Sequence, residues 1–481
     1  MKKIRCVCLH TVKDNRTLII NKRIANSMIV SVKKSTPAGE ITAPASKSYT
    51  HRAVLAASLG KNECRLSHPL LSADTKSTME ACRLFGANVE EKTNPETNEK
   101  IILIQGFDGK PKNPEKPVDV GNSGTTLRFM TALSGLTDGE VVLTGDESIQ
   151  KRSNAPLLET LNKTGAEISS IQNNGCAPLV VKGKINPGVF SIDGSMSSQF
   201  ISALLLVCPL LKENSKIMID GELKSKPYVD ITLEIAQKAG VRIYEKQSAG
   251  TKNDAGLLND AGIFYEIPAN QTYNLGDYTI PGDFSSASYL LTAAALIPGA
   301  DITMSGLFPS AQGDSAIVEI LEKAGADISW DKEKGVIHVS NKAGKRLKGI
   351  IWDAGITPDL VPTLAVLGAF SDGETRITNA EHVRFKETDR LKAMAEELTK
   401  IGAVIEETAD GLFISGEKSK GKMKGAAVCG RDDHRIVMSL FIAGMITGEM
   451  EIDTAESVQI SYPDFFEDMK KVGAVFETKQ N

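Results

Sequence analysis

The hydrophobic pattern of the chain repeats. An amphipathic run ends six times at a glycine and is followed by alternating apolar and polar residues. In the fourth copy, Ile317, Ile320, Leu321 and Ala324 lie at helical spacing before Gly325. That spacing predicts one buried helix face, and the glycine marks its C-terminus. Each copy is therefore predicted to contain a helix, a glycine turn and a strand. The glycines are Gly86, Gly165, Gly240, Gly325, Gly402 and Gly473.

A second predicted helix recurs in each copy and begins with small polar residues. An apolar run of about a dozen residues follows, as at 200–211 or 289–297, and leads into a strand such as 216–219. Small polar residues before an apolar run are typical N-caps. The six starts lie at residues 45–48, 121–125, 194–198, 282–286, 355–359 and 430–435.

The repetition of these starts predicts a function. One unit of roughly 75 residues used six times indicates an α/β protein in which all six starts point the same way. Free N–H groups and the positive end of the helix dipole attract phosphates and carboxylates. One exposed helix end contributes only about 0.3–1 kcal/mol, but several that converge where water is excluded contribute more. We therefore expect an enzyme that gathers small anionic substrates.

Bulk composition narrows this picture. A chain of 481 residues exceeds what one core usually organises, so two domains are expected. The net charge of −4 favours no nucleic-acid partner, and any anion site must be local. No apolar run approaches the ~20 residues that span a membrane. The seven cysteines are scattered without a C-x-x-C pair, which indicates a reduced, cytoplasmic protein.

Two segments differ from the repeat. Residues 1–27 are basic and lack the apolar core of a signal peptide, while a strand pattern begins only after Met28. We expect a dispensable extension there. Residues 248–262 have the composition of a surface loop.

Cations accompany the helix starts and two polar loops. In the run 384–390, Lys386 and Arg390 are one helical turn apart and would share a face of a helix. On spacing alone, an exposed ladder of ion pairs is the favoured interpretation of this run, with anion binding as the alternative. The other candidate cations are Lys47, Arg52, Arg128, Lys151, Arg152, Arg431 and Arg435.

Together these motifs resemble a known family. The chain is similar to the 3-phosphoshikimate 1-carboxyvinyltransferases, also called 5-enolpyruvylshikimate-3-phosphate synthases, from about residue 29 to residue 477. The matching motifs lie at residues 46–48 with Arg52, and at 121–128, 194–200, 225–228, 282–287, 386–390 and 433–435.

The resemblance implies an architecture. It predicts a two-domain inverse barrel of six βαβαββ repeats, three per domain, with the active site in the interdomain cleft. The first domain would comprise residues 28–44 plus 282–481, and the second residues 45–281. A monomer is expected.

It also implies a reaction and its residues. The enolpyruvyl group of phosphoenolpyruvate would be transferred to the 5-hydroxyl of shikimate 3-phosphate, releasing phosphate, without a metal or organic cofactor. Asp359 would be the base and Glu387 the acid that protonates the C3 methylene, assisted by Lys47 and Lys386. The shikimate 3-phosphate ligands would be Lys47, Ser48, Arg52, Ser197, Ser198, Gln199, Ser225, Asp359 and Lys386. The phosphoenolpyruvate ligands would be Lys47, Gly124, Arg152, Gln199, Arg390 and Arg435.

Three residues depart from the family pattern. Phe129 stands where plant and enteric members have proline, His382 where many have asparagine, and Ile460 where those members have a lysine that contacts phosphoenolpyruvate. These departures bear on substrate affinity and on sensitivity to glyphosate, the phosphoenolpyruvate-site inhibitor of the family. They leave the expected fold and reaction unchanged.

Domain closure is expected to depend on substrate. Helix starts and cations on both domains would repel one another until a bound anion bridges them.

Two other functions compete with this one. The sister family transfers enolpyruvyl to a UDP-sugar and carries a cysteine in the loop corresponding to residues 145–156, where this chain has none. A non-catalytic scaffold with the same fold would lose charges at the helix starts, whereas here they remain.

Overall fold

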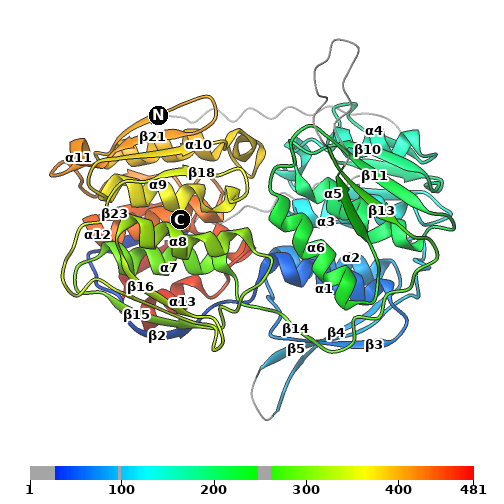
Figure 1. The fold of residues 1–481 in the computed structure, drawn as a ribbon, viewed down its shortest axis with the longest axis horizontal. Coiled ribbons are helices and arrows are strands. Elements are labelled where there is room, and N and C mark those ends of the chain that lie inside the picture. Colours follow the sequence, from blue (N-terminus) through cyan, green and yellow to red (C-terminus); the bar gives the residue numbers. More distant parts are fainter. Residues whose placement is uncertain (1–27, 96–98, 248–261, 481) are drawn as a thin grey trace, which may run out of the picture.

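The computed structural model describes residues 28–95, 99–247 and 262–480, which form two lobes side by side (Figure 1). We name the described residues of 28–44 and 282–480 the first lobe, and those of 45–281 the second lobe. The predicted extension at 1–27 and all but the last residue of the predicted loop at 248–262 lie outside these ranges. The first strand begins at Met28, as the hydrophobic pattern predicts.

Six four-stranded sheets share one plan. In each, the first two strands in the order run parallel and the other pairings are antiparallel. The second lobe contains β6(Val118–Asp119)-β7(Val141–Thr144)-β9(Leu179–Lys182)-β8(Glu167–Ser170), β10(Val189–Asp193)-β11(Ser215–Asp220)-β13(Ile263–Ile267)-β12(Tyr244–Gln247) and β14(Tyr278–Thr279)-β3(Glu63–Ser67)-β5(Lys100–Gln105)-β4(Asn88–Thr93). The first lobe contains β18(Ile351–Asp353)-β19(Glu374–Thr378)-β21(Leu412–Ser415)-β20(Val404–Glu407), β2(Ala38–Thr42)-β15(Asp301–Ser305)-β17(Val336–Ser340)-β16(Asp327–Asp331) and β22(Ala427–Val428)-β23(Met450–Ile452)-β1(Met28–Lys33)-β24(Val475–Gln480).

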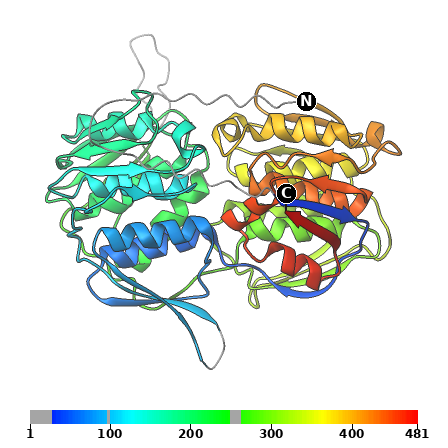
Figure 2. The same ribbon diagram turned by 180° about the vertical axis from the view of Figure 1, so that it is seen from behind.

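The two ends of the described chain close the first lobe. Strand β1 pairs with β24 over six residues, and Figure 2 shows the first strand in blue beside the last in red. Strand β2 pairs in parallel with β15, more than 250 residues later in the chain. Three complete repeats in this lobe therefore need both chain ends.

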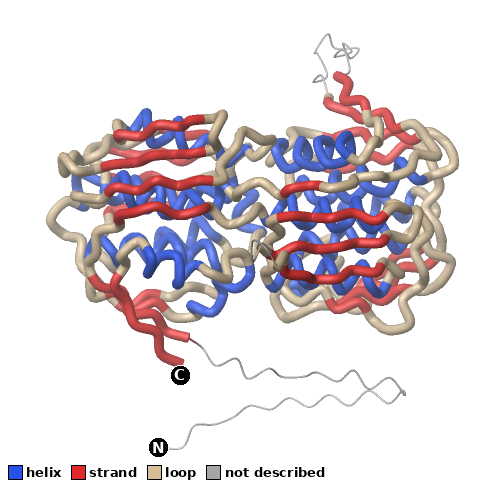
Figure 3. Tube along the Cα trace, turned by 90° about the horizontal axis from the view of Figure 1, so that it is seen from below, coloured by secondary structure: helices blue, strands red, loops and turns tan. Residues whose placement is uncertain are grey.

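The helices lie inside the sheets (Figure 3). Six helices are buried almost throughout, because their own side chains are mostly apolar or small on every face. These helices are α1(Lys47–Leu59), α3(Gly124–Ser134), α5(Ser198–Val207), α7(Phe284–Leu296), α9(Val361–Phe370) and α12(His434–Thr447). Six others are amphipathic or partly exposed: α2(Ala73–Leu84), α4(Ala155–Lys163), α6(Lys226–Lys238), α8(Ile317–Ala324), α10(Arg390–Lys400) and α13(Phe465–Lys471). The short elements are α11(Gly416–Ser419), η1(Ile149–Lys151), η2(Cys208–Leu210), η3(Gly313–Ala316), η4(Pro358–Leu360), η5(Glu381–Phe385) and η6(Ala455–Ile460).

The glycine turns follow the predicted pattern. All six repeat glycines adopt positive φ, between +80° and +107°. A side chain there would be strained, which explains why glycine ends the helix at each of these positions.

Two separate hydrophobic cores divide the described residues. One includes Ala43 and resumes at Phe284, and the other runs from Ala45 to Ile280. The first core is therefore the interior of the first lobe, and the other core is the interior of the second lobe. The two crossings between lobes are hydrogen-bonded to each other, with the Ser46 N–H donating to the Pro281 carbonyl at 2.8 Å.

Within the described ranges, no helix combines the length and the apolar character needed to cross a membrane.

Candidate active site

The helix starts of the two lobes meet at the interface between them. The Tyr228 hydroxyl, on α6, donates to Asp359 on η4 at 2.7 Å. The Ser225 N–H, at the N-cap of α6, donates to the Gly355 carbonyl at 2.8 Å. Arg152 approaches Glu387 to 3.6 Å. Residues far apart in the sequence therefore form one polar site between the lobes.

Asp359 is the centre of this site on the first lobe. Besides the Tyr228 hydroxyl, it accepts hydrogen bonds from Arg390 Nη1 at 2.9 Å and from Arg435 Nη2 at 2.8 Å. Burial opposes its ionisation, but Arg435, Lys386 and Arg390 hold its pKa well below the ordinary value. Asp359 is therefore ionised and hydrogen-bonded in several directions.

Arg390 is enclosed by carboxylates. Its side chain is 1% exposed and pairs with Asp433 at 2.8 Å, with Asp359, and with Glu387 at 2.7 Å. Burial alone would lower its pKa, but Asp433, Glu387 and Asp359 raise it. An exposed ladder of ion pairs in the run 384–390 is therefore the wrong interpretation of Arg390. In this run, the interpretation as a surface ion pair fits Arg384, which pairs with Asp389 at 2.9 Å near the surface.

Lys386 and Arg390 do not share a helix face, contrary to the prediction from their spacing. Lys386 has extended backbone after η5, and Asp389 caps a new helix, α10, that begins at Arg390. Among the described residues, no carboxylate lies within ion-pair distance of the Lys386 ammonium. Burial lowers its pKa, while the nearby Asp359 opposes that change.

Glu387 is held by two predicted phosphoenolpyruvate ligands. Arg390 donates to it at 2.7 Å, and Arg152 lies 3.6 Å away from the opposite lobe. Burial disfavours the carboxylate, but Arg390 and Arg152 keep its pKa well below the ordinary value. In this arrangement Glu387 is an anion, and it can act as an acid only after its arginines acquire another partner.

Arg52 represents the opposite situation on the second lobe. It is 2% exposed, and no carboxylate in the described ranges lies within 4 Å of it. Its guanidinium donates instead to the Thr232 hydroxyl at 2.7 Å and the Tyr228 carbonyl at 2.9 Å, and it lies 5.5 Å from the Phe129 ring. Burial lowers its pKa to about 10.

Arg128 is a second buried cation of this kind. It is 7% exposed, donates to the Gln199 side chain at 3.2 Å and lies over the Phe200 ring at 5.6 Å. Its Nε is buried without a hydrogen-bond partner in the described part of the chain. Burial and the neighbouring Arg152 lower its pKa to about 9, while Glu387 opposes that change. Arg128 itself has no carboxylate within ion-pair distance in the described ranges, which makes it a strong attractor for an anion.

Gly124 and Arg152 lie directly beside Arg128. Gly124 is the first residue of α3, and a Cβ atom there would collide with the Arg128 guanidinium and lie 3.3 Å from Arg152. Arg152 is positioned by the Asn122 side chain at 2.9 Å and by Ser148 at 2.7 Å. Its neighbour Lys151 is exposed and takes no part in the site.

Lys47 and Ser48 lie at the start of α1, next to the crossing between the lobes. The Lys47 ammonium pairs with Asp74 at 3.1 Å and is 17% exposed. Burial raises the pKa of Asp74, and Lys47 opposes that change. Lys47 is therefore the most accessible predicted ligand among the paired cations of the site.

The other three predicted serine ligands also begin helices of the second lobe. Ser197 caps α5 and accepts the Gln199 N–H at 3.3 Å, while Ser198 is the first residue of that helix. Ser225 precedes α6 with a φ of +55°. That left-handed backbone is uncommon outside glycine and carries its N–H to the Gly355 carbonyl of the other lobe.

Contacts across the interface join opposite charges. Arg152 faces Glu387, and Lys224 lies 3.4 Å from Glu381. The expectation that like charges oppose each other across the lobes therefore omits the carboxylates that accompany the cations of the first lobe.

The three departures from the family pattern differ in their surroundings. Phe129 is fully buried beneath Arg52. His382 is 3% exposed, neither ring nitrogen has a partner in the described ranges, and burial lowers its pKa to about 4. Ile460 ends η6 and is half-buried.

Some residues of the site carry no sequence signal for their role. Asp433 appears as an N-cap of α12, but it is also the main partner of Arg390. Tyr228 and Asp314 meet only across the lobes. Arg431, a predicted candidate, is instead paired with Glu396 and Glu397. No pattern along the chain distinguishes these outcomes, since each depends on a distant partner.

Comparison with known proteins agrees with the geometry. The sequence profile of the family described as EPSP synthase (3-phosphoshikimate 1-carboxyvinyltransferase) matches residues 32–469. A protein of Methanosarcina acetivorans named 3-phosphoshikimate 1-carboxyvinyltransferase is 54% identical over 446 residues, which cover 93% of this chain and 98% of that protein.

Solved structures extend this agreement to the fold. EPSP synthase from Acinetobacter baumannii superimposes with a TM-score of 0.75 at 25% identity, covering 94% of this chain and 100% of that one. The enolpyruvyl transferase NikO from Streptomyces tendae superimposes with a TM-score of 0.72 at 16% identity over 95% of this chain and 99% of its own, which supports the fold alone. The resemblance and the inverse-barrel architecture predicted from the motifs are confirmed, and the chain belongs to the EPSP synthase (3-phosphoshikimate 1-carboxyvinyltransferase) family.

Proposed function

We propose that the polar interface between the lobes binds shikimate 3-phosphate and phosphoenolpyruvate and transfers the enolpyruvyl group between them. As a transferase of its family, the chain forms a bond from the 5-hydroxyl oxygen to C2 of phosphoenolpyruvate and releases phosphate. The observation that carries the assignment is the contrast across the interface. In the second lobe, Arg52 and Arg128 are buried with no carboxylate of the described ranges within ion-pair distance, whereas the first lobe carries the ionised Asp359.

The charge of the substrates matches this site. Two phosphate monoesters and two carboxylates bring roughly −5 to −6 into one place. We place shikimate 3-phosphate against Lys47, Arg52 and the helix starts of the second lobe, facing Asp359 and Lys386. This puts the dianionic phosphate beside a cation that has no carboxylate of its own. Its proposed ligands are Lys47, Ser48, Arg52, Ser197, Ser198, Gln199, Ser225, Asp359 and Lys386.

Phosphoenolpyruvate is placed beside the start of α3. The absence of a side chain at Gly124 lets an anion approach the backbone next to Arg128 and Arg152. We add Arg128 to the ligands because its Nε is buried and unpaired in the described structure. The other proposed ligands are Lys47, Gly124, Arg152, Gln199, Arg390 and Arg435.

Asp359 acts as the base in this proposal. It takes the proton of the 5-hydroxyl as the oxygen attacks C2, and its low pKa keeps it ionised at neutral pH. Binding of phosphoenolpyruvate withdraws Arg390 and Arg435 from Asp359. That exchange raises the basicity of Asp359 at the step that needs it.

Glu387 acts as the acid. A substrate anion that accepts the hydrogen bonds of Arg390 and Arg152 offsets the positive charges that hold the pKa of Glu387 down. Glu387 can then bind a proton and deliver it to C3. When phosphate leaves from C2, the same carboxylate is placed to take the proton back, while Lys47 and Lys386 stabilise the charge on the phosphate and the developing alkoxide.

Closure is part of the proposal. We infer that the lobes are the two moving domains of a monomer, 28–44 plus 282–481 and 45–281, and that shikimate 3-phosphate stabilises their contact. The five cysteines in the described ranges are unpaired, which supports a cytoplasmic location.

The test is phosphate release with each substrate omitted in turn. We expect release only when shikimate 3-phosphate and phosphoenolpyruvate are both present. Release that needs a UDP-sugar in place of shikimate 3-phosphate would identify the sister activity. No release with either acceptor from a protein that binds both substrates would favour a non-catalytic role.

A further inference from the structure

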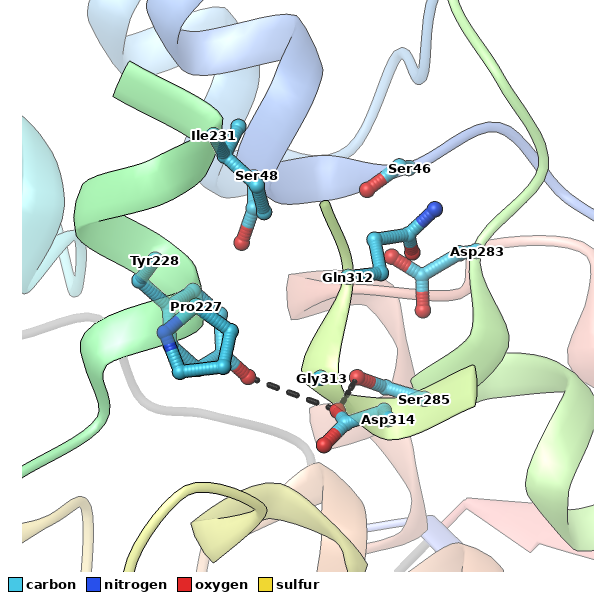
Figure 4. Close-up of a pocket in the computed structure, with 10 residues that line it drawn as sticks. All are labelled: Ser46, Ser48, Pro227, Tyr228, Ile231, Asp283, Ser285, Gln312, Gly313 and Asp314. Carbon is cyan, nitrogen blue, oxygen red and sulfur yellow. Dashed lines mark hydrogen bonds between the residues drawn. The ribbon is translucent and has the colours of Figure 1, made fainter. Parts of the chain in front are cut away.

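A small polar cavity lies beneath the site, where the two crossings between lobes meet (Figure 4). Its volume is about 10 Å³, which is space for about one water molecule and none for a substrate. Ser48 and Tyr228 line it from the second lobe, and Asp283, Ser285 and Asp314 from the first. Apart from one water molecule, the polar groups around it can be satisfied only by one another.

Asp314 is the less satisfied of the two carboxylates that line the cavity. It is 3% exposed, its Oδ2 accepts a hydrogen bond from the Ser285 hydroxyl, and the Tyr228 hydroxyl lies 3.4 Å away (Figure 4). Its Oδ1 is buried and has no hydrogen-bond partner among the described residues. A buried carboxylate with one bare oxygen is costly, whereas a neutral carboxyl group needs fewer partners.

The charges that face Asp314 also disfavour its ionised form. Asp359, from η4, accepts the same Tyr228 hydroxyl at 2.7 Å, and Asp283 lies at the N-cap of α7. Arg435, from α12, is the cation that acts most strongly on it, and its Nη2 is already bonded to Asp359 at 2.8 Å. Burial and Asp359 raise the pKa of Asp314 to about 7, while Arg435 and Ser285 oppose that change.

We propose that Asp314 is a positioning residue that stays protonated, leaves the Tyr228 hydroxyl to Asp359, and so fixes the base across the interface between the lobes. A neutral Asp314 does not compete with Asp359 for this single donor. Because Tyr228 belongs to the second lobe and both carboxyl groups to the first, the same hydrogen bond also favours contact between the lobes. The inference rests on the proposed role of Asp359 as the base.

The proposal has a direction in pH. As pH rises through about 7, Asp314 loses its proton to solvent and becomes a second carboxylate beside Asp359. The two anions then repel each other and compete for the Tyr228 hydroxyl. Turnover and binding of shikimate 3-phosphate should both decline on the alkaline side, approaching tenfold for each pH unit above the transition.

The decisive variant is Asp314→Asn, which imitates the neutral carboxyl group. We expect kcat/KM for shikimate 3-phosphate within about threefold of the unmutated value at pH 6, and no decline between pH 7 and pH 9. The substrate phosphates titrate near pH 6 in both proteins, so the difference between the two profiles reports the enzyme group alone. Superimposable profiles, or an equal loss at every pH, would overturn the proposal.

Asp283→Asn is the matched control. It removes a carboxylate from the same cavity and keeps Asp314, so the alkaline decline should persist. A profile that became flat in this variant as well would show that any lost charge in the cavity suffices, against a specific role for Asp314.

Infrared spectroscopy of the unmutated protein gives a readout that does not depend on turnover. A protonated carboxyl C=O band should be present at pH 6, vanish by pH 9 and be missing from Asp314→Asn at both. Absence of the band at pH 6 would refute the protonated state. A band with the expected titration in a protein that releases no phosphate would leave Asp314 protonated and overturn the proposed function instead.

Discussion

The two lobes hold their buried arginines in opposite ways. In the first lobe, Arg390 and Arg435 are paired with Asp433, Asp359 and Glu387 at 2.7–2.9 Å. In the second lobe, Arg52 and Arg128 are equally buried but are surrounded by hydroxyls, carbonyls and aromatic rings. Equal burial therefore conceals opposite electrostatic states.

The difference indicates an order of events. Burial of a guanidinium without a carboxylate costs free energy, and a bound anion offsets that cost. The second lobe can therefore bind an anion without first breaking an ion pair. The arginines of the first lobe must first exchange their carboxylates for the substrate. That exchange frees the proposed base and acid in the same step.

The largest effect expected from this contrast is on stability. Arg390→Met should reduce the free energy of unfolding by about 3–5 kcal/mol, because Asp433, Asp359 and Glu387 would lose their shared cation. Arg52→Met, equally buried, strands no carboxylate and should cost clearly less. Urea unfolding of both variants measures the difference, and equal losses would remove the distinction between the lobes.

Asp359→Ala should reduce kcat by about 100-fold or more, the usual scale for a general base. Binding of shikimate 3-phosphate should remain measurable by calorimetry, because Arg52 and Lys47 are untouched. Asp372→Ala, which removes a surface carboxylate that pairs with Arg346 at 2.6 Å, is the control and should leave kcat unchanged. Near-normal turnover in folded Asp359→Ala would reject this residue as the base.

Coupling between the substrates tests the proposed order. Glyphosate should bind more tightly with shikimate 3-phosphate present, by about 1–3 kcal/mol, because the first anion holds the lobes together. Calorimetric titration with and without shikimate 3-phosphate measures this coupling, and scattering follows the radius of gyration. Identical affinities and an unchanged radius would mean that the site is preformed.

Gly124→Ala should have a smaller effect, about 1–2 kcal/mol on anion binding at the start of α3, since the new methyl group displaces the Arg128 guanidinium. Ki for glyphosate should rise proportionally more than KM for phosphoenolpyruvate, because the inhibitor is longer. Steady-state inhibition kinetics give both constants. A parallel rise would refute the steric explanation.

Deletion of residues 1–27 should have the smallest effect. Nothing in this segment resembles the repeat, so turnover and melting temperature should be almost unchanged. A fall of several degrees in Tm would show that the segment packs against the body.

Local signals in the sequence account for much of the fold. The six glycines predict helix ends correctly because positive φ is a property of one residue and its neighbours. Ser123, Ser197 and Asp433 are recognisable as N-caps for the same reason, since each side chain bonds within its own helix turn. The motifs identify the family, and with it the expected site residues.

Only the tertiary structure decided which charged and polar side chains contact one another across the molecule. The spacing of Lys386 and Arg390 suggests one helix face, but the cap at Asp389 begins a new helix and turns Arg390 toward Asp433. Arg52 and Arg390 look alike in the sequence, yet among the described residues Arg390 pairs with three carboxylates and Arg52 with none. Asp314 meets Tyr228 only because the two crossings place the lobes together. Charge and burial at such sites depend on groups tens to hundreds of residues away, so a pattern along the chain predicts where the cations are, and the fold determines which of them are free to bind an anion.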